Sequence, residues 1–291
     1  MDADIWDGAA VLVKAVLYAA TLGAAGGIFF LMYSRSLLGR GDQPAIARPL
    51  RILIAAAIAA SAARVLITAG SMSEHAAGML DPQLLAMVWH GGEGSAAAIR
   101  AGGLLLAVPA LARDGRAGWI AIAGAALAAT SFAWVGHVHS AAPRAAPLLL
   151  GIHILAAAFW VGALAPLLIL TRRREPRELG ALAARFGRMA VVIVGALLAA
   201  GAAVLWICLE SVSELWTSPY GRIACVKITW VAGLLALAAW NKLRLVPRIA
   251  AGDALAVRIF RRSVCAEMLV AGLILLVTAA LTTLAGPPSM S

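Results

Sequence analysis

Charged residues, aromatic residues and cysteines are all scarce in this sequence. Of its 291 residues, 13% are charged, 6% are aromatic and 3 are cysteine. Soluble domains carry about 25% charged residues, so this composition excludes a soluble protein. With 63% hydrophobic residues, the sequence is that of an integral membrane protein.

The cysteines carry no recognisable motif. Cys208, Cys225 and Cys265 include no C-x-x-C pair, which is the usual signature of thiol redox sites and zinc sites. We expect all three to pack among apolar side chains. A disulfide between Cys208 and Cys225, or a ligand role for either, is the alternative.

Long apolar stretches are abundant. A helix needs roughly 20 apolar residues to cross a bilayer core, and stretches of that length recur along the whole chain, with connections too short to form a separate domain. The sequence therefore predicts an all-α fold, a polytopic membrane bundle that forms a single domain over residues 1–291. Its eight predicted transmembrane helices lie approximately at 9–33, 50–71, 83–108, 118–136, 147–170, 190–210, 223–240 and 264–284.

Positive charge is concentrated in every second loop. The loops after the first, third, fifth and seventh predicted helices hold 18 of the 24 Lys and Arg residues: Arg35, Arg40, Arg48, Arg51, Arg113, Arg116, Arg172, Arg173, Arg174, Arg177, Arg185, Arg188, Lys242, Arg244, Arg248, Arg258, Arg261 and Arg262. Basic loops stay inside the cell, so we expect both termini on the outer side. The opening MDADIWD is acidic, unlike a secretory signal, so we expect the first helix to be retained. The net charge of +10 thus reflects topology and not nucleic-acid binding.

The histidines all fall in the outer half of the predicted bundle. Three of the five lie in GHVHSAAPRAAPLLLGIH, at 136–153. At 1.5 Å rise per residue, His90 and His153 would both lie roughly 10 Å below the outer boundary, where they can meet if their helices are neighbours. One intramembrane histidine can be a hydrogen-bonded packing residue. Ionisable groups inside a bilayer usually line a pathway or a site, so the gathered histidines indicate a site that receives something from outside.

The residues around His90 indicate which ligand this site takes. Met87, His90 and Glu93 follow at intervals of three on one predicted helix, which turns their side chains toward roughly the same side. Imidazole suits copper, zinc, iron and nickel, and a thioether favours Cu(I). Glu93 is also expected to pair with Arg64. The sequence therefore predicts an outer-half site for Cu(I) or Cu(II), with His75 as a further outermost ligand and its main ligands drawn from His90, His153, His137, Met87, His139 and Glu93.

Three stretches of the chain also resemble a known family. They are GH at 136–137, HILAAAFWVGALAPL from His153 to Leu167, and SPYGRIACVKITWVAGLLALAAWNKLRLVPRI from Ser218 to Ile249. Together they resemble the copper resistance protein D (CopD) family of bacterial inner-membrane proteins. The residues that match the family's pattern are Gly136, His137, His153, Trp160, Gly162, Tyr220, Gly221, Arg222, Lys227 and Asn241.

The resemblance implies a multi-pass protein of the bacterial inner membrane, with eight helices, that handles copper. It implies transport of copper across that membrane together with a periplasmic copper-binding protein, which we expect to be a separate chain. We also expect no enzymatic activity, since no nucleophile, base and orienting group stand together near the histidines.

A haem-binding electron-transfer protein of the cytochrome b type is the alternative. Paired histidines on neighbouring helices of a bundle can also hold haem iron. A transmembrane electron path normally uses a second haem near the inner face, and no histidine is predicted there, so we favour copper. For the direction of transport we favour uptake, because the histidines and Met72, Met79 and Met87 all fall in the outer half. Export, with the same site at its release end, is the alternative.

Overall fold

The computed structural model describes residues 2–112, 118–134, 145–209 and 211–285. Over these residues every regular element is helical, which confirms the predicted all-α class. The described part contains six helices that are long and apolar enough to cross a membrane. They are α1 (Asp2–Ser34), α2 (Asp42–Ser73), α7 (Ala146–Leu170), α8 (Pro176–Cys208), α10 (Pro219–Trp240) and α12 (Ala254–Leu284).

The other elements are shorter. They are the helices α3 (Pro82–His90), α4 (Gly92–Ala107), α5 (Gly118–Thr130), α9 (Glu214–Thr217) and α11 (Val246–Ala250), the 3₁₀ turns η1 (Arg35–Leu37), η2 (Ala76–Leu80), η3 (Val108–Leu111) and η4 (Ser131–Trp134), and the π-helical turn η5 (Asn241–Leu245). With 16 and 13 residues, α4 and α5 correspond to two of the eight predicted spans. The six long helices correspond to the other predicted spans.

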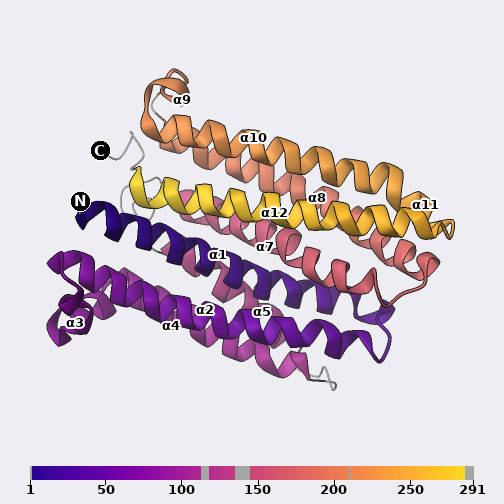
Figure 1. The fold of residues 1–291 in the computed structure, drawn as a ribbon, viewed down its shortest axis with the longest axis horizontal. Helices are drawn as coiled ribbons and strands as arrows, with labels where there is room; N and C mark the ends of the chain where they lie inside the picture. Colours follow the sequence, from indigo (N-terminus) through magenta and orange to yellow (C-terminus); the bar gives the residue numbers. More distant parts are fainter. Residues whose placement is uncertain (1, 113–117, 135–144, 210, 286–291) are drawn as a thin grey trace.

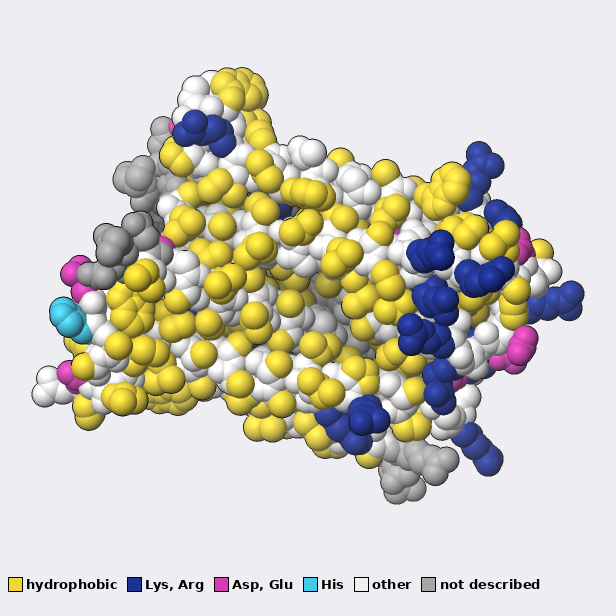
Figure 2. All heavy atoms as spheres, in the orientation of Figure 1, with side chains coloured by type: hydrophobic (Ala, Val, Ile, Leu, Met, Phe, Trp, Pro, Cys, Tyr) yellow, Lys and Arg dark blue, Asp and Glu magenta, His cyan; other side chains and the backbone are white. Residues whose placement is uncertain are grey.

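The long helices lie side by side, and α1 begins at the same end of the bundle at which α12 finishes (Figure 1). Most of the arginine and lysine side chains in view gather at the opposite end (Figure 2). The start of the chain and the basic loops therefore lie at opposite ends, as the charge pattern predicts. Helix α1 is central and packs against α2, α5, α7 and α12.

Helices α1 and α7 touch through their backbones. A Cβ atom added to Gly26 would overlap the carbonyl of Ala158, and one added to Gly162 would overlap the backbone of Gly26 and Gly27. In lipid there is no hydrophobic driving force between helices. The close approach at small residues instead stabilises the helix pair through van der Waals contact. Gly162, which matches the family pattern, is thus needed for helix packing.

Arg174 ties two turns together at the basic end. It pairs with Asp42 at the start of α2 and donates to Glu178 at 2.6 Å and to the Leu37 carbonyl at 2.9 Å. The hydrogen bonds to Glu178 and then Asp42 raise the pKa of the guanidinium above its ordinary value. The turn between α7 and α8 is therefore fixed to the turn between α1 and α2.

The predicted helix over 83–108 is divided in the structure. Helix α3 ends at His90, and Gly91 has extended backbone angles of φ −84° and ψ −173°. The chain then turns so tightly that a Cβ atom at Gly94 would overlap the backbone of Trp89. Two glycines with no side chain to clash permit this break, which moves His90 from the interior of a long helix to the end of a short one.

The seventh predicted span continues past its expected end through η5 into α11. Pro247 has no N–H and its ring excludes the carbonyl four residues earlier, so it disturbs the regular helical hydrogen bonds. The chain widens into the π-helical turn just before it, over Asn241–Leu245. π-Helical turns of this kind can kink a helix and are frequent at functional sites.

Candidate metal centre and buried polar groups

His90 and Met87 lie at the outer surface of the described part. Both are on α3, and both are exposed, with 60% of the Met87 side chain accessible. Helix α3 packs against α2, α4 and η2. His75 is exposed in the turn before η2, where its Nδ1 lies 2.8 Å from the Ser73 carbonyl. These residues are open to an ion that arrives from that end of the bundle.

Glu93 forms the ion pair that the sequence predicted. Its Oε1 accepts hydrogen bonds from Arg64 Nη2 at 3.2 Å and Nε at 3.3 Å. Both side chains are largely covered, so the pair joins α2 to α4 away from bulk water. One oxygen of Glu93 is therefore already engaged.

Arg100 lies deeper, and hydroxyl groups take the place of a carboxylate partner. It donates to Ser131 Oγ and to Ser61 Oγ, each at 3.0 Å, and its guanidinium carbon lies 4.3 Å from the centre of the Phe132 ring. Nearby, Lys14 donates to the Thr282 carbonyl at 2.9 Å. These bonds connect α1, α2, α4, η4 and α12, and those of Arg100 satisfy a buried cation that would otherwise be costly.

His153 is held against α8. Its Nδ1 lies 3.0 Å from the Leu197 carbonyl oxygen, and because a carbonyl only accepts, Nδ1 must carry the proton. The other ring nitrogen, Nε2, then has a lone pair that is available to a metal, which is the usual arrangement for a metal-ligating histidine. A Cβ atom at Gly201 would lie 2.8 Å from the ring, so this glycine makes room for it.

The structure does not bring the whole predicted ligand set together. Helix α7, which carries His153, packs against α1, α5, α8 and α12, whereas α3 packs elsewhere. His137 and His139 fall outside the described residues. Within the described residues no three His, Cys, Asp or Glu side chains lie close enough to hold one metal ion.

The cysteines are all free thiols, so the alternative of a Cys208–Cys225 disulfide is not realised. Cys208 is buried, as expected. Cys225 is half-buried and its thiol donates to the Leu215 carbonyl at 3.4 Å. Cys265 differs from the expectation, because it is exposed on α12, where lipid can cover it.

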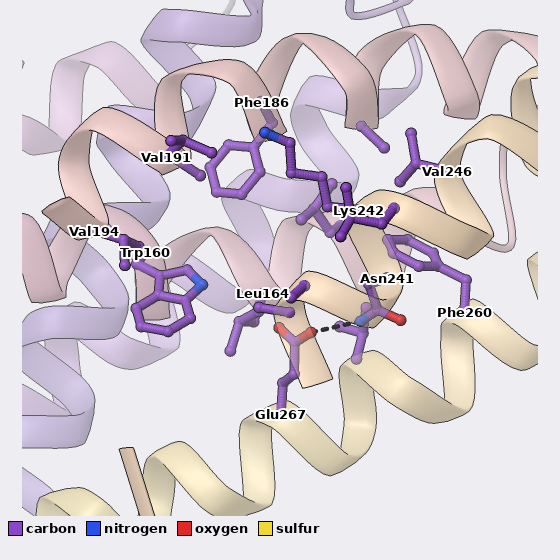
Figure 3. A pocket seen from close by; sticks show the side chains of 18 of the residues that line it. Trp160, Leu164, Phe186, Val191, Val194, Asn241, Lys242, Val246, Phe260 and Glu267 are labelled. Atoms are coloured by element: carbon purple, nitrogen blue, oxygen red, sulfur yellow. Dashed lines mark hydrogen bonds between the residues drawn. The ribbon is translucent and has the colours of Figure 1, made fainter. Parts of the chain in front are cut away.

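A cavity of about 380 Å³ lies between α7, α8, α10, η5 and α12. Its walls are mostly apolar, with Trp160, Phe186 and Phe260 among them, and its polar groups come from Asn241, Lys242 and Glu267 (Figure 3). Glu267 was not among the functional residues predicted from the sequence. The signal was present, because a lone carboxylate in an apolar span is a candidate functional residue.

Two family matches cover most of the chain. Residues 3–143 match the family described as Copper resistance protein D-like, N-terminal domain, and residues 180–281 match Copper resistance protein D. Searches of the curated proteins and of the solved structures find no match. Both matched families are described as copper resistance protein D or D-like, and the long apolar helices fit a multi-pass membrane protein. This chain belongs to the copper resistance protein D family.

Proposed function

We propose that this protein carries copper ions across the bacterial inner membrane, from the periplasm toward the cytoplasm, as a transporter and not as an enzyme. The family relates the chain to copper, and its apolar helices suit a lipid bilayer. The observation that carries the proposal is the geometry of His153. Its Nδ1 is engaged by Leu197, which leaves Nε2 as a metal ligand inside the bundle.

The proposed ligands form a path from the exposed end inward. Met87 and His90 are exposed on α3 and receive the ion, and His153 takes it on α7. The remaining proposed ligands are His137, His139 and Glu93. Glu93 contributes the oxygen that Arg64 does not hold, and the thioether of Met87 suits Cu(I) better than Cu(II).

The proposed direction follows from charge. If the basic end faces the cytoplasm, as basic loops do, the termini and the exposed ligands face the periplasm. Arginines and lysines around the inner end repel a cation that approaches from the cytoplasm. They favour collection of the ion at the other end, from a separate periplasmic copper-binding protein.

The test is copper accumulation in a copper-sensitive host. Cells that express the native chain should hold more copper after washing, and should be more sensitive to it, than cells that express His153→Ala. His75→Ala is the matched control, because this exposed histidine lies in a turn, and it should keep most of the uptake. Lower cell copper and higher tolerance that depend on His153 would show export. Equal copper content with and without the native chain would overturn the proposal.

A further inference from the structure

Glu267 is a carboxyl group buried within an apolar wall. It lies on α12 with 4% of its surface exposed. It faces the cavity near Leu164 (Figure 3), and Phe260 and Val264 of the same helix also line the cavity. An ionised carboxylate is unstable in such surroundings unless a cation or several donors compensate it.

The partners of Glu267 do not supply that compensation. Its Oε1 accepts one hydrogen bond of 2.5 Å from the Asn241 amide nitrogen, and the described residues offer it no salt bridge. The Asn241 Oδ1 atom is itself buried without a hydrogen-bond partner among the described residues. This neutral amide leaves the charge of an ionised Glu267 uncompensated.

The charged groups on the elements around α12 are turned elsewhere. Lys242 of η5 lines the same cavity, but its side chain extends away from Glu267 (Figure 3). Lys14 of α1 bonds to Thr282 near the far end of α12, and Arg248 of α11 pairs with Asp253 at 2.7 Å. Helices α7 and α10 line the cavity with apolar side chains only.

The cavity lies on the basic side of His153. Helices α7 and α8 carry both the His153–Leu197 contact and the cavity residues Trp160 and Val194. Trp160 follows His153 by about two helical turns, or roughly 10 Å along the axis, and His153 itself does not line the cavity. At the other end the cavity reaches η5. An ion that left His153 toward the basic end would meet this cavity next.

We propose that Glu267 is an intramembrane proton-binding site of the transport cycle. Its carboxyl carries a proton while the cavity holds no ion. When a copper cation enters from His153, the carboxyl O–H bond breaks, the proton passes to water at the basic end, and the carboxylate balances one positive charge of the ion. The copper keeps its oxidation state. This inference rests on the proposed copper transport and adds proton coupling to it.

The first test reads the carboxyl group directly, without transport. Infrared difference spectra of the purified full chain, native against Glu267→Gln, should show the C=O stretch of a protonated carboxylic acid in the native protein at neutral pH. Glutamine can still accept the hydrogen bond from Asn241, so the variant should fold, and size-exclusion chromatography checks this. Glu178→Gln is the matched control and should keep the band, because Glu178 is an exposed partner of Arg174. If the native protein and Glu267→Gln give the same carboxyl spectrum, Glu267 is ionised and the proposal is wrong.

The second test measures coupling in proteoliposomes that contain a pH-sensitive dye. Added Cu(I) should move protons through the native protein, whereas Glu267→Gln should lose this copper-dependent proton movement. Native proton movement in Glu267→Gln would overturn the coupling. A native protein that moves no copper would overturn the proposed transport, and the coupling with it. The infrared band would still decide whether Glu267 binds a proton.

Discussion

The imidazole of His153 donates from Nδ1 to the carbonyl oxygen of Leu197, 3.0 Å away on the neighbouring helix. This contact fixes the tautomer and the orientation of the ring. The same face of α8 lacks a side chain at Gly201, directly against the ring. The position of the candidate ligand thus depends on a carbonyl and a glycine of another helix.

Gly201→Ala should weaken copper binding. The added methyl group would lie 2.8 Å from the ring of His153 and must displace it. Changes in the groups that orient a metal ligand typically reduce affinity by about 10- to 100-fold, and we expect a loss in that range by equilibrium titration with a Cu(I) chelator. Gly195→Ala is the control on the same helix, because a Cβ atom there has nothing within 4 Å. Equal affinities of the two variants would contradict the role of His153 as a ligand.

His90 and His153 should act separately, because the proposed path takes the ion from one to the other and their helices α3 and α7 pack against different neighbours. His90→Ala and His153→Ala should each lower the bound copper, and the double variant should lose about the sum of the two, because independent sites add. His75→Ala should lose less. Copper content per chain, measured by elemental analysis, is the readout. Full stoichiometry in both single variants would show that neither histidine holds the ion.

The purified protein should contain copper and show no Soret band. Of the described histidines, His75 and His90 are exposed and His153 is turned toward α8, so the described residues offer no facing pair for haem iron. One optical spectrum together with metal analysis checks this. A strong Soret band that disappears in His153→Ala would favour the cytochrome alternative.

Both termini should be reachable from the periplasm. Tags at the two ends should react with a protease in intact spheroplasts, because α1 begins and α12 finishes at the end opposite the basic loops (Figures 1 and 2). In a variant without native cysteines, a cysteine at Arg172, which is exposed in the turn after α7, should be labelled only after lysis. Labelling of that cysteine in intact spheroplasts would reverse the orientation and the proposed direction of transport.

The start of α12 should loosen in acid. Asp253 accepts hydrogen bonds from the backbone N–H groups of Leu255 and Ala256 and from Arg248. These interactions, the bond to Ala256 foremost, hold the pKa of this carboxyl below its ordinary value. Since the unfolded-state pKa is about 3.9, the cap stabilises the helix fully above about pH 4 and is lost as pH falls through the lowered pKa.

Amide exchange measures this effect. Protection factors in the first turn of α12 should fall in acid in the native chain. In Asp253→Asn they should be independent of pH, because asparagine also caps helices. Acid-insensitive protection in the native chain would show that the cap does not stabilise this turn.

Much of the fold could be predicted from hydropathy and charge. A membrane protein needs long apolar helices, which hydropathy locates, and the charge of the loops indicates at which end of the bundle each loop lies. The Arg64–Glu93 pair could be predicted for a similar reason, since two opposite charges inside a bilayer need each other. The break at Gly91 was missed because the apolar residues on both sides fit one continuous span, although the adjacent glycines Gly91 and Gly92 are a turn signal. The cavity could not be predicted, because it depends on how the side chains of α7, α8, α10 and α12 pack around Glu267.

The backbone contact of Gly26 with Gly162 has a consequence for how an ion crosses. Two helices that touch without intervening side chains leave no space for a hydrated or dehydrated cation between them. Helices α1 and α7 thus leave no passage where they touch. In the proposed transport the ion would have to cross on another side of α7, and the cavity lies on the side that faces α8, α10 and α12. Bulkier residues at these two glycines would push the two helices apart.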